Sequence, residues 1–440
     1  MNRYVLIGNG VAGISAAEAI RQHDPAGEIM LIGNEAQEFY SRPGLPYLLS
    51  GEVPEDSLFP MDKEDYRQLN LRRWRAVVKA IDPLKHWVSL ENGSVINYDR
   101  LLVATGATAA FPPVPGTQLQ RVVKMDTLED VRRIFELGRT AHSAVIVGGG
   151  ITALELVEGL LARGVRVHYF LRGERYWSSV LSEAESGIIE TRLKHAGARL
   201  YYQTELAEIV GDRGRVSGVK TKDNHLLRCD MVGIAIGVRP RKEMAEASGL
   251  KAERGIIVNE TLQTNHADIF AAGDVAQVLN PLTGQSSLDS LWFPARDQGF
   301  TAGLNMSGIA TPYQKKTALN VTRLAGLTTT ILGMVGGARD AVPDYVDRGE
   351  SETWRRASGA LSVEADSDTT HLRMLVGEKN LAGALIMGDQ KFSPPLQGLI
   401  AGEVDISPIR AELIRPGILK TDLLSRFWNQ WQEKEHAGRV

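Results

Sequence analysis

Cysteine is nearly absent from this sequence, which has a single copy, Cys229, among 440 residues. One thiol excludes an internal disulfide framework and suits a protein of the reducing cytoplasm. Cys229 lies on an apolar strand that leads to Met231, and thiolate chemistry requires access and a lowered pKa. We therefore expect Cys229 to be a buried structural thiol.

Metal-ligand spacings and membrane-spanning runs are lacking as well. The nine histidines form no H-x-x-H, H-E-x-x-H or Cys/His pattern, so no metal site is predicted. The longest weakly polar run, residues 324–338, is too short and too rich in threonine to span a bilayer. A strand begins at Tyr4 without a basic leader and a long apolar run, so we expect no signal peptide. With a net charge of −3, neither nucleic acid nor a membrane surface is an expected partner, and we predict a cytoplasmic protein.

The chain does contain an internal near-repeat. The segment YVLIGNGVAGISAAEAI begins at Tyr4, and AVIVGGGITALELVEGL begins at Ala144. Each is a short apolar run, a glycine-rich turn and then apolar residues at helical spacing, which is typical of the opening of a βαβ unit. Each continues into a second strand, over residues 29–35 and 165–171. The repeat predicts two dinucleotide-binding units.

The glycines of the first turn meet separate needs. Gly8 makes the tight turn, Gly10 lets the backbone approach a pyrophosphate, and Gly13 lets the helix lie close to the strand. The helix N-terminus then offers free N–H groups to the phosphates. Glu35 ends the next strand, where a carboxylate accepts ribose hydroxyls. A glycine-rich turn without a ligand is the alternative, and the succession of strand, turn, helix, strand and acid argues against it.

The second turn, residues 148–153, departs from the first at two points. Ala153 stands where the third glycine would be, which the motif tolerates. Leu171 occupies the acidic position, and Arg172 and Arg175 follow it. An acid there binds the 2′-hydroxyl of NAD, whereas arginines can pair with the 2′-phosphate of NADP. We therefore favour NADPH over NADH; the alternative is that both arginines are solvated loop residues.

Further motifs complete an ordered set. ATG ends a strand at residues 104–106, GVRP ends another at 237–240, and AAGDVA spans 271–276. With GNGVAG, ATG, GGGITA-LE, GVRP and AAGDVA in this order, the chain resembles the FAD-dependent pyridine nucleotide-disulfide oxidoreductase superfamily along essentially its whole length. On the C-terminal run LRMLVGEKNLAGALIMGD, the resemblance is nearest to NADH:rubredoxin reductases and to the flavin module of nitrite reductases, without the redox cysteine.

The resemblance implies an α/β fold with two Rossmann-like dinucleotide-binding domains and a C-terminal α+β domain. It implies an FAD-binding domain over residues 1–112 and 241–312, an NAD(P)H-binding domain over 113–240 and a rubredoxin-reductase-like domain over 313–440. Asp274 would hold the ribitol of FAD. The expected FAD contacts are Gly8, Gly10, Val11, Ala12, Gly13, Glu35, Arg42, Pro43, Val78, Ala104, Thr105, Gly106, Gly273 and Asp274. The expected NAD(P)H contacts are Gly148, Gly150, Ile151, Thr152, Glu155, Arg172, Arg175 and Gly237.

The stretch from Arg42 to Tyr47 follows the first acidic strand end, and by the same resemblance it lies against the flavin. Its prolines predict a rigid loop that enters a short helix. Relatives that reduce coenzyme A disulfide, peroxide or oxygen have a cysteine where Pro43 stands, and ferredoxin reductases have a lysine where Tyr47 stands. The loop thus supplies no sulfur. Pro43, Tyr47 and Glu155 are expected to flank the flavin, which carries the chemistry, and no side chain is assigned a catalytic role.

The predicted function is that of an FAD-containing NAD(P)H oxidoreductase, which passes electrons through the flavin to a small redox protein or iron–sulfur partner of rubredoxin or ferredoxin type. One alternative is direct reduction of a small molecule such as oxygen, a quinone or a disulfide. Another is an FAD-bearing, non-catalytic subunit of a larger redox complex, which Leu171 favours because it weakens the nicotinamide site. The protein could act as a homo-oligomer or within a redox complex.

The last expected helix has an apolar face. Leu423, Leu424, Phe427, Trp428 and Trp431 recur at helical spacing. We expect this face to close the C-terminal domain, with association as the alternative. Trp428 is expected to pack inward and Trp431 to lie at an edge.

Overall fold

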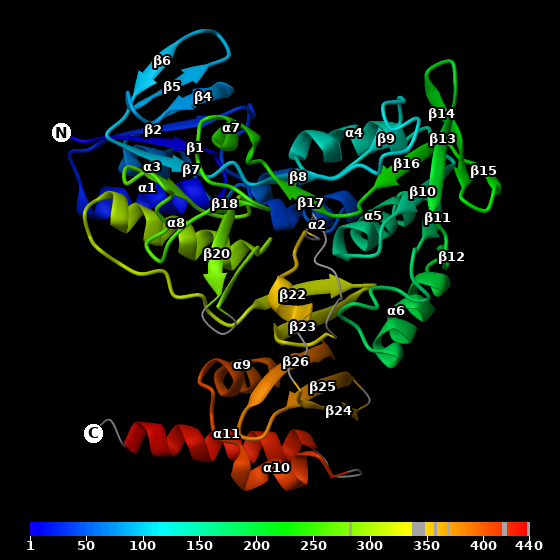
Figure 1. Cartoon of the computed structure of the whole chain (residues 1–440). Coiled ribbons are helices and arrows are strands. Elements are labelled where there is room, and N and C mark those ends of the chain that lie inside the picture. Colours follow the sequence, from blue (N-terminus) through cyan, green and yellow to red (C-terminus); the bar gives the residue numbers. More distant parts are fainter. Residues whose placement is uncertain (281–283, 337–347, 356–358, 368, 416–419, 438–440) are drawn as a thin grey trace. The chain divides into compact units, whose positions relative to one another are not determined.

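The computed structural model describes the chain apart from residues 281–283, 337–347, 356–358, 368, 416–419 and 438–440 (Figure 1). Its residues form two compact units. The expected boundaries of three domains stay a prediction, because residues 173–195 group with the C-terminal part of the chain rather than with the rest of the expected NAD(P)H-binding domain. The first unit consists of Met1–Arg172, Ala196–Lys315 and Pro343–Glu350, and the second of Gly173–His195, Lys316–Val342 and Ser351–Val440.

One sheet of the first unit carries the first glycine motif. Its five strands are parallel and follow the order β19-β7-β1-β2-β3. The central strands β1 and β7 are buried along most of their length, as expected of a parallel sheet that is covered on both faces. The strands are β1 (Arg3–Ile7), β2 (Glu28–Gly33), β3 (Leu71–Arg75), β7 (Arg100–Val103) and β19 (Ile269–Ala271).

A second parallel sheet repeats this arrangement, in the order β12-β11-β10-β16-β9. In both sheets the strand before the glycine turn, β1 or β10, lies between the strand that follows the next helix and a strand from later in the chain. This matched topology confirms the predicted α/β fold with two dinucleotide-binding units. The strands are β9 (Val122–Val123), β10 (Ser143–Val147), β11 (Arg166–Phe170), β12 (Arg199–Tyr201) and β16 (Met231–Ile234).

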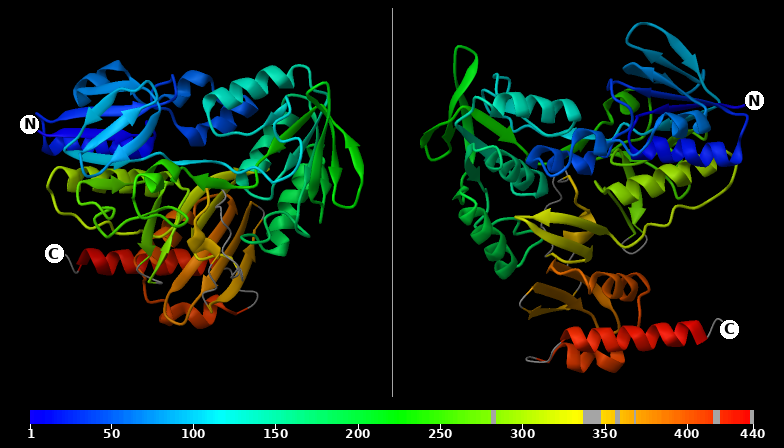
Figure 2. Two further views of the ribbon diagram at one scale, coloured as in Figure 1. Left: turned by 45° about the horizontal axis from the view of Figure 1, so that its top comes forward. Right: turned by 180° about the vertical axis from the view of Figure 1, so that it is seen from behind.

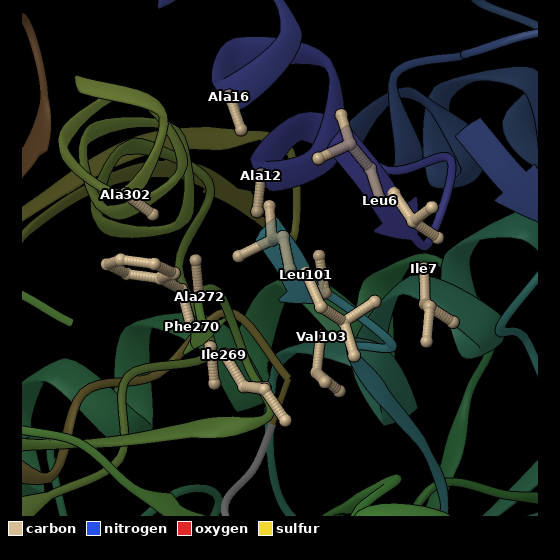
Figure 3. Packing of buried hydrophobic residues seen from close by; sticks show 14 of the residues in the cluster. Leu6, Ile7, Ala12, Ala16, Leu101, Val103, Ile269, Phe270, Ala272 and Ala302 are labelled. Carbon is tan, nitrogen blue, oxygen red and sulfur yellow. The ribbon is translucent and has the colours of Figure 1, made fainter. Parts of the chain in front are cut away.

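Helices α1 and α8 pack closely in the first unit (Figure 1). A Cβ added at Gly299 of α8 would lie 2.1 Å from the carbonyl oxygen of Ala12 in α1, so only glycine permits this approach. Figure 3 shows Ala12 and Ala302 on the two helices, next to the larger Leu101 and Phe270 of the sheet. The helices of this unit are α1 (Val11–His23), η1 (Arg42–Gly44), α2 (Leu45–Ser50), η2 (Glu55–Leu58), α3 (Lys63–Leu69), α4 (Leu128–Gly138), α5 (Ile151–Leu161), α7 (Glu243–Ala247) and α8 (Trp292–Met306).

A short antiparallel ribbon links the two parallel sheets. Strand β8 follows β7, and it pairs with β17, which follows β16. Small antiparallel or mixed sheets complete the unit. The remaining strands are β4 (Val78–Asp82), β5 (Trp87–Leu90), β6 (Val95–Asn97), β8 (Ala107–Ala109), β13 (Leu206–Asp212), β14 (Arg215–Thr221), β15 (Leu226–Arg228), β17 (Val238–Pro240), β18 (Ile256–Ile257), β20 (Ala276–Asn280) and β21 (Gln285–Ser287).

The second unit is built on an antiparallel sheet in the order β22-β23-β26-β25-β24. Helices and this sheet form a separate α+β core, as expected for the C-terminal region. Its strands are β22 (Leu319–Leu324), β23 (Leu327–Gly333), β24 (Leu361–Asp366), β25 (Thr370–Val376) and β26 (Leu381–Gly388). Its helices are α6 (Glu183–His195), η3 (Glu352–Arg355), α9 (Ser393–Ala401), α10 (Ser407–Leu413) and α11 (Lys420–Ala437).

Helix α11, the red helix of Figure 2, contacts both α10 and α9. Leu423 and Leu424 are buried in the core of the second unit. Trp428 packs on α9, where a Cβ added at Gly398 would lie 2.1 Å from its ring, and Trp431 stacks on Trp428 with ring centres 5.2 Å apart. The apolar face therefore closes its own unit. Among the described residues, no helix has the length and the apolar character needed to cross a membrane.

A buried ionic cluster joins α6 to β25 within the second unit. Arg373 donates from Nε to Glu185 Oε1 at 2.8 Å and from Nη2 to the carbonyl oxygen of Val180 at 2.7 Å. His371 lies 2.6 Å from Asp366 Oδ1 and 3.4 Å from Glu185 Oε1. Burial raises the pKa of Glu185, but His371 and Arg373 outweigh it, and the pKa lies below its ordinary value. The cluster thus holds a buried carboxylate in its charged form.

Candidate functional site

A cavity of about 430 Å³ opens at the carboxyl ends of β1, β2 and β7. Ligands of open α/β sheets bind at this edge, and the volume is that of an ordinary small-molecule site. Most of the residues predicted to contact FAD meet here. The cavity is lined by Gly8, Gly10, Val11, Ala12, Glu35, Arg42, Val78, Ala104, Thr105, Gly106, Gly273 and Asp274 from that set.

The glycines of the first motif give a direct test of whether a dinucleotide fits. Gly8 has φ of +128°, and an added Cβ would lie 2.0 Å from the carbonyl oxygen of Ala104. A Cβ at Gly13 would lie 2.1 Å from the carbonyl oxygen of Gly8, so the fold itself requires both glycines. Gly10 differs, because its φ of −99° suits any residue and an added Cβ would meet no atom of the described residues within 4 Å. The space beside Gly10 therefore fits a ligand group that approaches the backbone.

The loop from Arg42 to Tyr47 has the predicted form. A 3₁₀ turn over Arg42–Gly44 leads into helix α2, and Pro43 lies in the turn. Arg42 lines the cavity, whereas the side chain of Pro43 is exposed. Neither Pro43 nor Tyr47 is among the described residues that line the cavity. Their expected position beside the flavin stays a prediction.

Glu35 and Arg42 form an ion pair at the cavity wall. Tyr40 Oη donates to Glu35 Oε2 at 2.6 Å, and Arg42 Nη1 donates to Tyr40 Oη at 2.9 Å. Arg42 also donates to the carbonyl oxygen of Asp126 at 2.8 Å, which ties the loop to the segment before α4. A carboxylate has about four lone-pair sites, so Glu35 keeps acceptor capacity for ribose hydroxyls.

Asp274 directly follows β19 and the turn at Gly273, and β19 is the edge strand of the sheet next to β7. Ser290 Oγ donates to Asp274 Oδ2 at 2.9 Å, and Gln298 Oε1 accepts from the backbone N–H of Gly273 at 2.8 Å. Burial raises the pKa of Asp274 above its ordinary value. A half-buried carboxyl that is held in place at a cavity wall suits the predicted contact with the ribitol hydroxyls.

A second, small cavity of about 20 Å³ lies beside the second glycine motif. Gly148 repeats the geometry of the first motif, since its φ is +149° and an added Cβ would lie 2.0 Å from the carbonyl oxygen of Ala235. Helix α5 begins after Gly150 without a side-chain cap, which leaves its first N–H groups for a ligand. Of the predicted NAD(P)H contacts, Gly150, Thr152 and Gly237 line this cavity. The predicted contacts of Gly148 and Ile151 stay predictions.

The two arginines expected to contact the 2′-phosphate of the nucleotide differ in their surroundings. Leu171 is buried, with its N–H bonded to the carbonyl oxygen of Tyr201 at 2.9 Å, and Arg172 is exposed. Arg175 donates from Nη2 to the carbonyl oxygen of Leu181 at 3.1 Å, so it is already used within its own loop. Arg172 is therefore the better candidate for a phosphate contact, and the preference for NADPH stays a prediction.

Glu155 lies on α5, one turn after the glycine motif, and is half-buried. Burial raises its pKa to about 8, with a further contribution from the charge of Glu158. A carboxyl with this pKa exchanges a proton near neutral pH, which is a common property of functional sites. Its expected place beside the flavin stays a prediction.

Sequence reasoning missed Tyr40, Asp126, Arg241 and Arg348. Tyr40, Arg241 and Arg348 line the first cavity, and Asp126 and Arg348 line the second. Arg241 directly follows the GVRP motif, which was a usable signal. Asp126 and Arg348 belong to no motif, and only the fold brings them to the site.

Cys229, the single thiol of the chain, is not in a state suited to redox chemistry. Its side chain is 4% exposed, and burial raises its pKa to about 12, so no thiolate is available near neutral pH. Among the described residues, no group of His, Cys, Asp or Glu is arranged to hold a metal ion.

Comparison with known proteins identifies relatives of this chain. The family model described as pyridine nucleotide-disulphide oxidoreductase matches residues 2–299. Rhodocoxin reductase of Rhodococcus erythropolis is 32% identical over 315 residues, which cover 70% of this chain and 73% of that protein. The assimilatory nitrate reductase electron transfer subunit of Bacillus subtilis is 25% identical over 417 residues. That match covers 94% of this chain and 51% of the relative, so this chain spans about half of its length.

A solved structure shares the fold. The ferredoxin reductase of Rhodopseudomonas palustris matches with a TM-score of 0.83 at 24% identity, over 96% of this chain and 100% of that chain. The two glycine motifs, the cavity at the first motif and the family match agree on the cofactors, FAD together with NADH or NADPH. The chain therefore belongs to the pyridine nucleotide-disulphide oxidoreductase family, as an FAD-dependent NAD(P)H oxidoreductase.

Proposed function

We propose that this protein takes electrons from NAD(P)H and passes them through FAD to a small redox protein of ferredoxin or rubredoxin type. The observation that carries the proposal is the combination of two dinucleotide motifs with a flavin loop that has no sulfur. Pro43 stands where a redox cysteine would be, and the sole thiol, Cys229, is buried in the connection between β15 and β16. Electrons have to leave the flavin without a protein disulfide as relay.

The chemistry of the cofactor fits this role, because a flavin accepts a pair of electrons from NAD(P)H and can release them singly. The protein supplies binding and orientation. Gly10 and the N-terminus of α1 suit the pyrophosphate, Asp274 suits the ribitol, and Glu155 can hold or release a proton near neutral pH. The names of rhodocoxin reductase and of the ferredoxin reductase among its relatives support a redox-protein acceptor.

Anaerobic stopped-flow mixing tests the proposal. NADH or NADPH should bleach the flavin absorbance, and a ferredoxin or a rubredoxin should then restore it faster than oxygen, a quinone or a disulfide does at the same concentration. Faster reoxidation by a small molecule would instead favour a direct reductase. Faster bleaching by NADPH than by NADH would support the proposed preference for NADPH.

An FAD-bearing subunit of a larger redox complex is a second candidate. It is favoured by the buried Leu171 at the position where an acid would bind NAD, and by the similarity to an electron transfer subunit about twice as long. Absence of bleaching with either nucleotide, together with co-purification of an iron–sulfur protein, would support this candidate.

Mass photometry of the purified protein distinguishes a monomer from a homo-oligomer.

We also propose that the protein works in the cytoplasm. The lone thiol is compatible with a reducing compartment, and NAD(P)H is produced there. Fractionation of cells with an antibody to this chain tests the location.

A further inference from the structure

Arg348 comes from a part of the chain far beyond both glycine motifs, yet it lines a cavity beside each of them. Among the described residues, it is the one that lines both the cavity at the first motif and the small cavity at the second motif. Arg42 and Arg241, by contrast, line the first cavity but are not among the described residues that line the second. Arg348 thus lies at the boundary between the two predicted cofactor sites.

The backbone next to Arg348 is bonded to Ser290, which in turn holds a carboxyl of the first cavity. Gly349 donates its N–H to the carbonyl oxygen of Ser290 at 2.9 Å, and Ser290 donates its N–H to the carbonyl oxygen of Glu350 at 3.0 Å. The hydroxyl of the same Ser290 donates to Asp274 at 2.9 Å. The position of Arg348 is therefore coupled to the carboxyl predicted to hold FAD.

The guanidinium of Arg348 forms an ion pair with Asp126. Arg348 Nη2 donates to Asp126 Oδ1 at 2.6 Å, while Lys124 Nζ and the N–H of Ala109 donate to Asp126 Oδ2, each at 2.8 Å. Burial raises the pKa of Asp126, but Arg348 and Lys124 outweigh it, and the pKa falls to about 2. Within the part of the chain that the structure describes, Arg348 Nε is buried and has no hydrogen-bond partner, so a donor remains for a bound group.

The charge of Arg348 acts on both sides of this boundary. It lowers the pKa of Glu155 beside the second motif and that of Asp274 beside the first, against the effect of burial in both cases. A cation in a partly buried site interacts more strongly than one in water, because the surroundings screen it less. Any charge that develops between the two cavities lies within its field.

We propose that Arg348 is a fixed cation that sets the reduction potential of the bound FAD. Held by Asp126 where the two cavities meet, its guanidinium favours the form of the cofactor that carries the extra electrons. The proposal rests on the FAD and NAD(P)H chemistry of the family and not on the identity of the electron acceptor. It can therefore be tested without nucleotide or acceptor, by chemical reduction.

The test is the midpoint potential of the flavin, measured against a reference dye under anaerobic reduction. Arg348→Gln should lower the two-electron potential by about 30 mV, which corresponds to about a tenfold change in the equilibrium constant. Arg348→Lys, which keeps the charge, should stay near the wild-type value. Arg132→Gln is the matched control, because Arg132 pairs with Glu55 on the surface and lines neither cavity. An unchanged potential in Arg348→Gln would overturn the proposal, even if NADPH bound more weakly.

Arg348→His covers the case in which the glutamine variant loses its flavin. An imidazole is charged at low pH and neutral at high pH, so one variant can be measured in both states. The difference in potential from wild type should be smaller at pH 6 than at pH 9. An equal difference at both values would show that Arg348 acts through packing alone and would overturn the proposal.

Discussion

Gly10 and Gly13 belong to the same motif, but different physical constraints act on them. The fold excludes a side chain at Gly13, where a Cβ would lie 2.1 Å from the carbonyl oxygen of Gly8. At Gly10 the protein alone would accept alanine, because the added Cβ meets open space. The two positions therefore separate the requirement of the fold from that of the ligand.

Gly10→Ala should fold with near-native stability and bind FAD more weakly. The added methyl group occupies space at which the pyrophosphate is expected, and we estimate a loss of about 1–3 kcal/mol, the range of an overpacked contact. Titration of the apoprotein with FAD, followed by flavin fluorescence, measures this loss. Gly13→Ala is the matched variant and should lower the yield of folded protein even before FAD is added. Native affinity in Gly10→Ala would contradict the assigned place of the pyrophosphate.

Arg172 and Arg175 are predicted to divide into a nucleotide-reading residue and a loop-supporting residue. Arg172→Ala should weaken NADPH binding by about 1.5–3 kcal/mol, the value of a hydrogen bond to a charged group, and leave NADH binding unchanged. Arg175→Ala removes a bond to the carbonyl oxygen of Leu181 and should not discriminate between the nucleotides. Dissociation constants from flavin-reduction kinetics measure both. An equal loss for NADH and NADPH in Arg172→Ala would exclude a contact with the 2′-phosphate.

At the scale of elements, the sequence pattern predicted the features that are encoded by neighbouring residues. The glycine turns and their flanking strands were identifiable because each is encoded within about thirty consecutive residues of a βαβ unit. The position of Arg348 was not, because it depends on backbone bonds to Ser290 and an ion pair to Asp126, which are distant in sequence. Arg175 was predicted as a phosphate ligand from its charge; the structure adds its bond to the carbonyl oxygen of Leu181, which a sequence does not show, and the phosphate contact stays a prediction.

The ionic cluster between α6 and β25 should make the second unit sensitive to pH. Burial opposes a charge on His371, but Glu185 and Asp366 outweigh it and raise the pKa of His371 above its ordinary value. A group with a raised pKa in the folded state stabilises fully below the unfolded value of about 6.5, and this stabilisation is lost as the pH rises through the folded value. The unfolding free energy of the second unit should therefore decrease from pH 6 to pH 9.

Chemical denaturation at a series of pH values measures this decrease. His371→Gln should lack it, whereas substitution of the exposed His195 in the same unit should keep it. Glu185 has the opposite sign, since its pKa is lowered, and its stabilisation is lost as the pH falls below the unfolded value of about 4.3. A pH dependence identical in wild type and His371→Gln would show that the imidazole carries no charge in this cluster.

At the scale of the whole molecule, the chain contains separate hydrophobic cores. One core is formed around the parallel sheet β19-β7-β1-β2-β3 of the first unit, and another is formed by the antiparallel sheet and helices of the second unit. The predicted FAD contacts that line the first cavity belong to the first unit. A ligand that binds one folded unit stabilises that unit by mass action, by about 2.7 kcal/mol at a concentration of one hundred times its Kd.

Differential scanning calorimetry should therefore resolve two unfolding transitions, of which added FAD raises only one. Leu424→Ala provides the complementary change, because Leu424 is fully buried in the second unit and its truncation should cost about 2–5 kcal/mol. This variant should lower the transition that FAD does not affect, and it should retain the flavin. The exposed Leu84 is the matched control, and Leu84→Ala should leave both transitions in place. A single transition that responds to FAD and to Leu424→Ala alike would mean that the two units unfold cooperatively, and helix α11 would then support the flavin site as well as its own core.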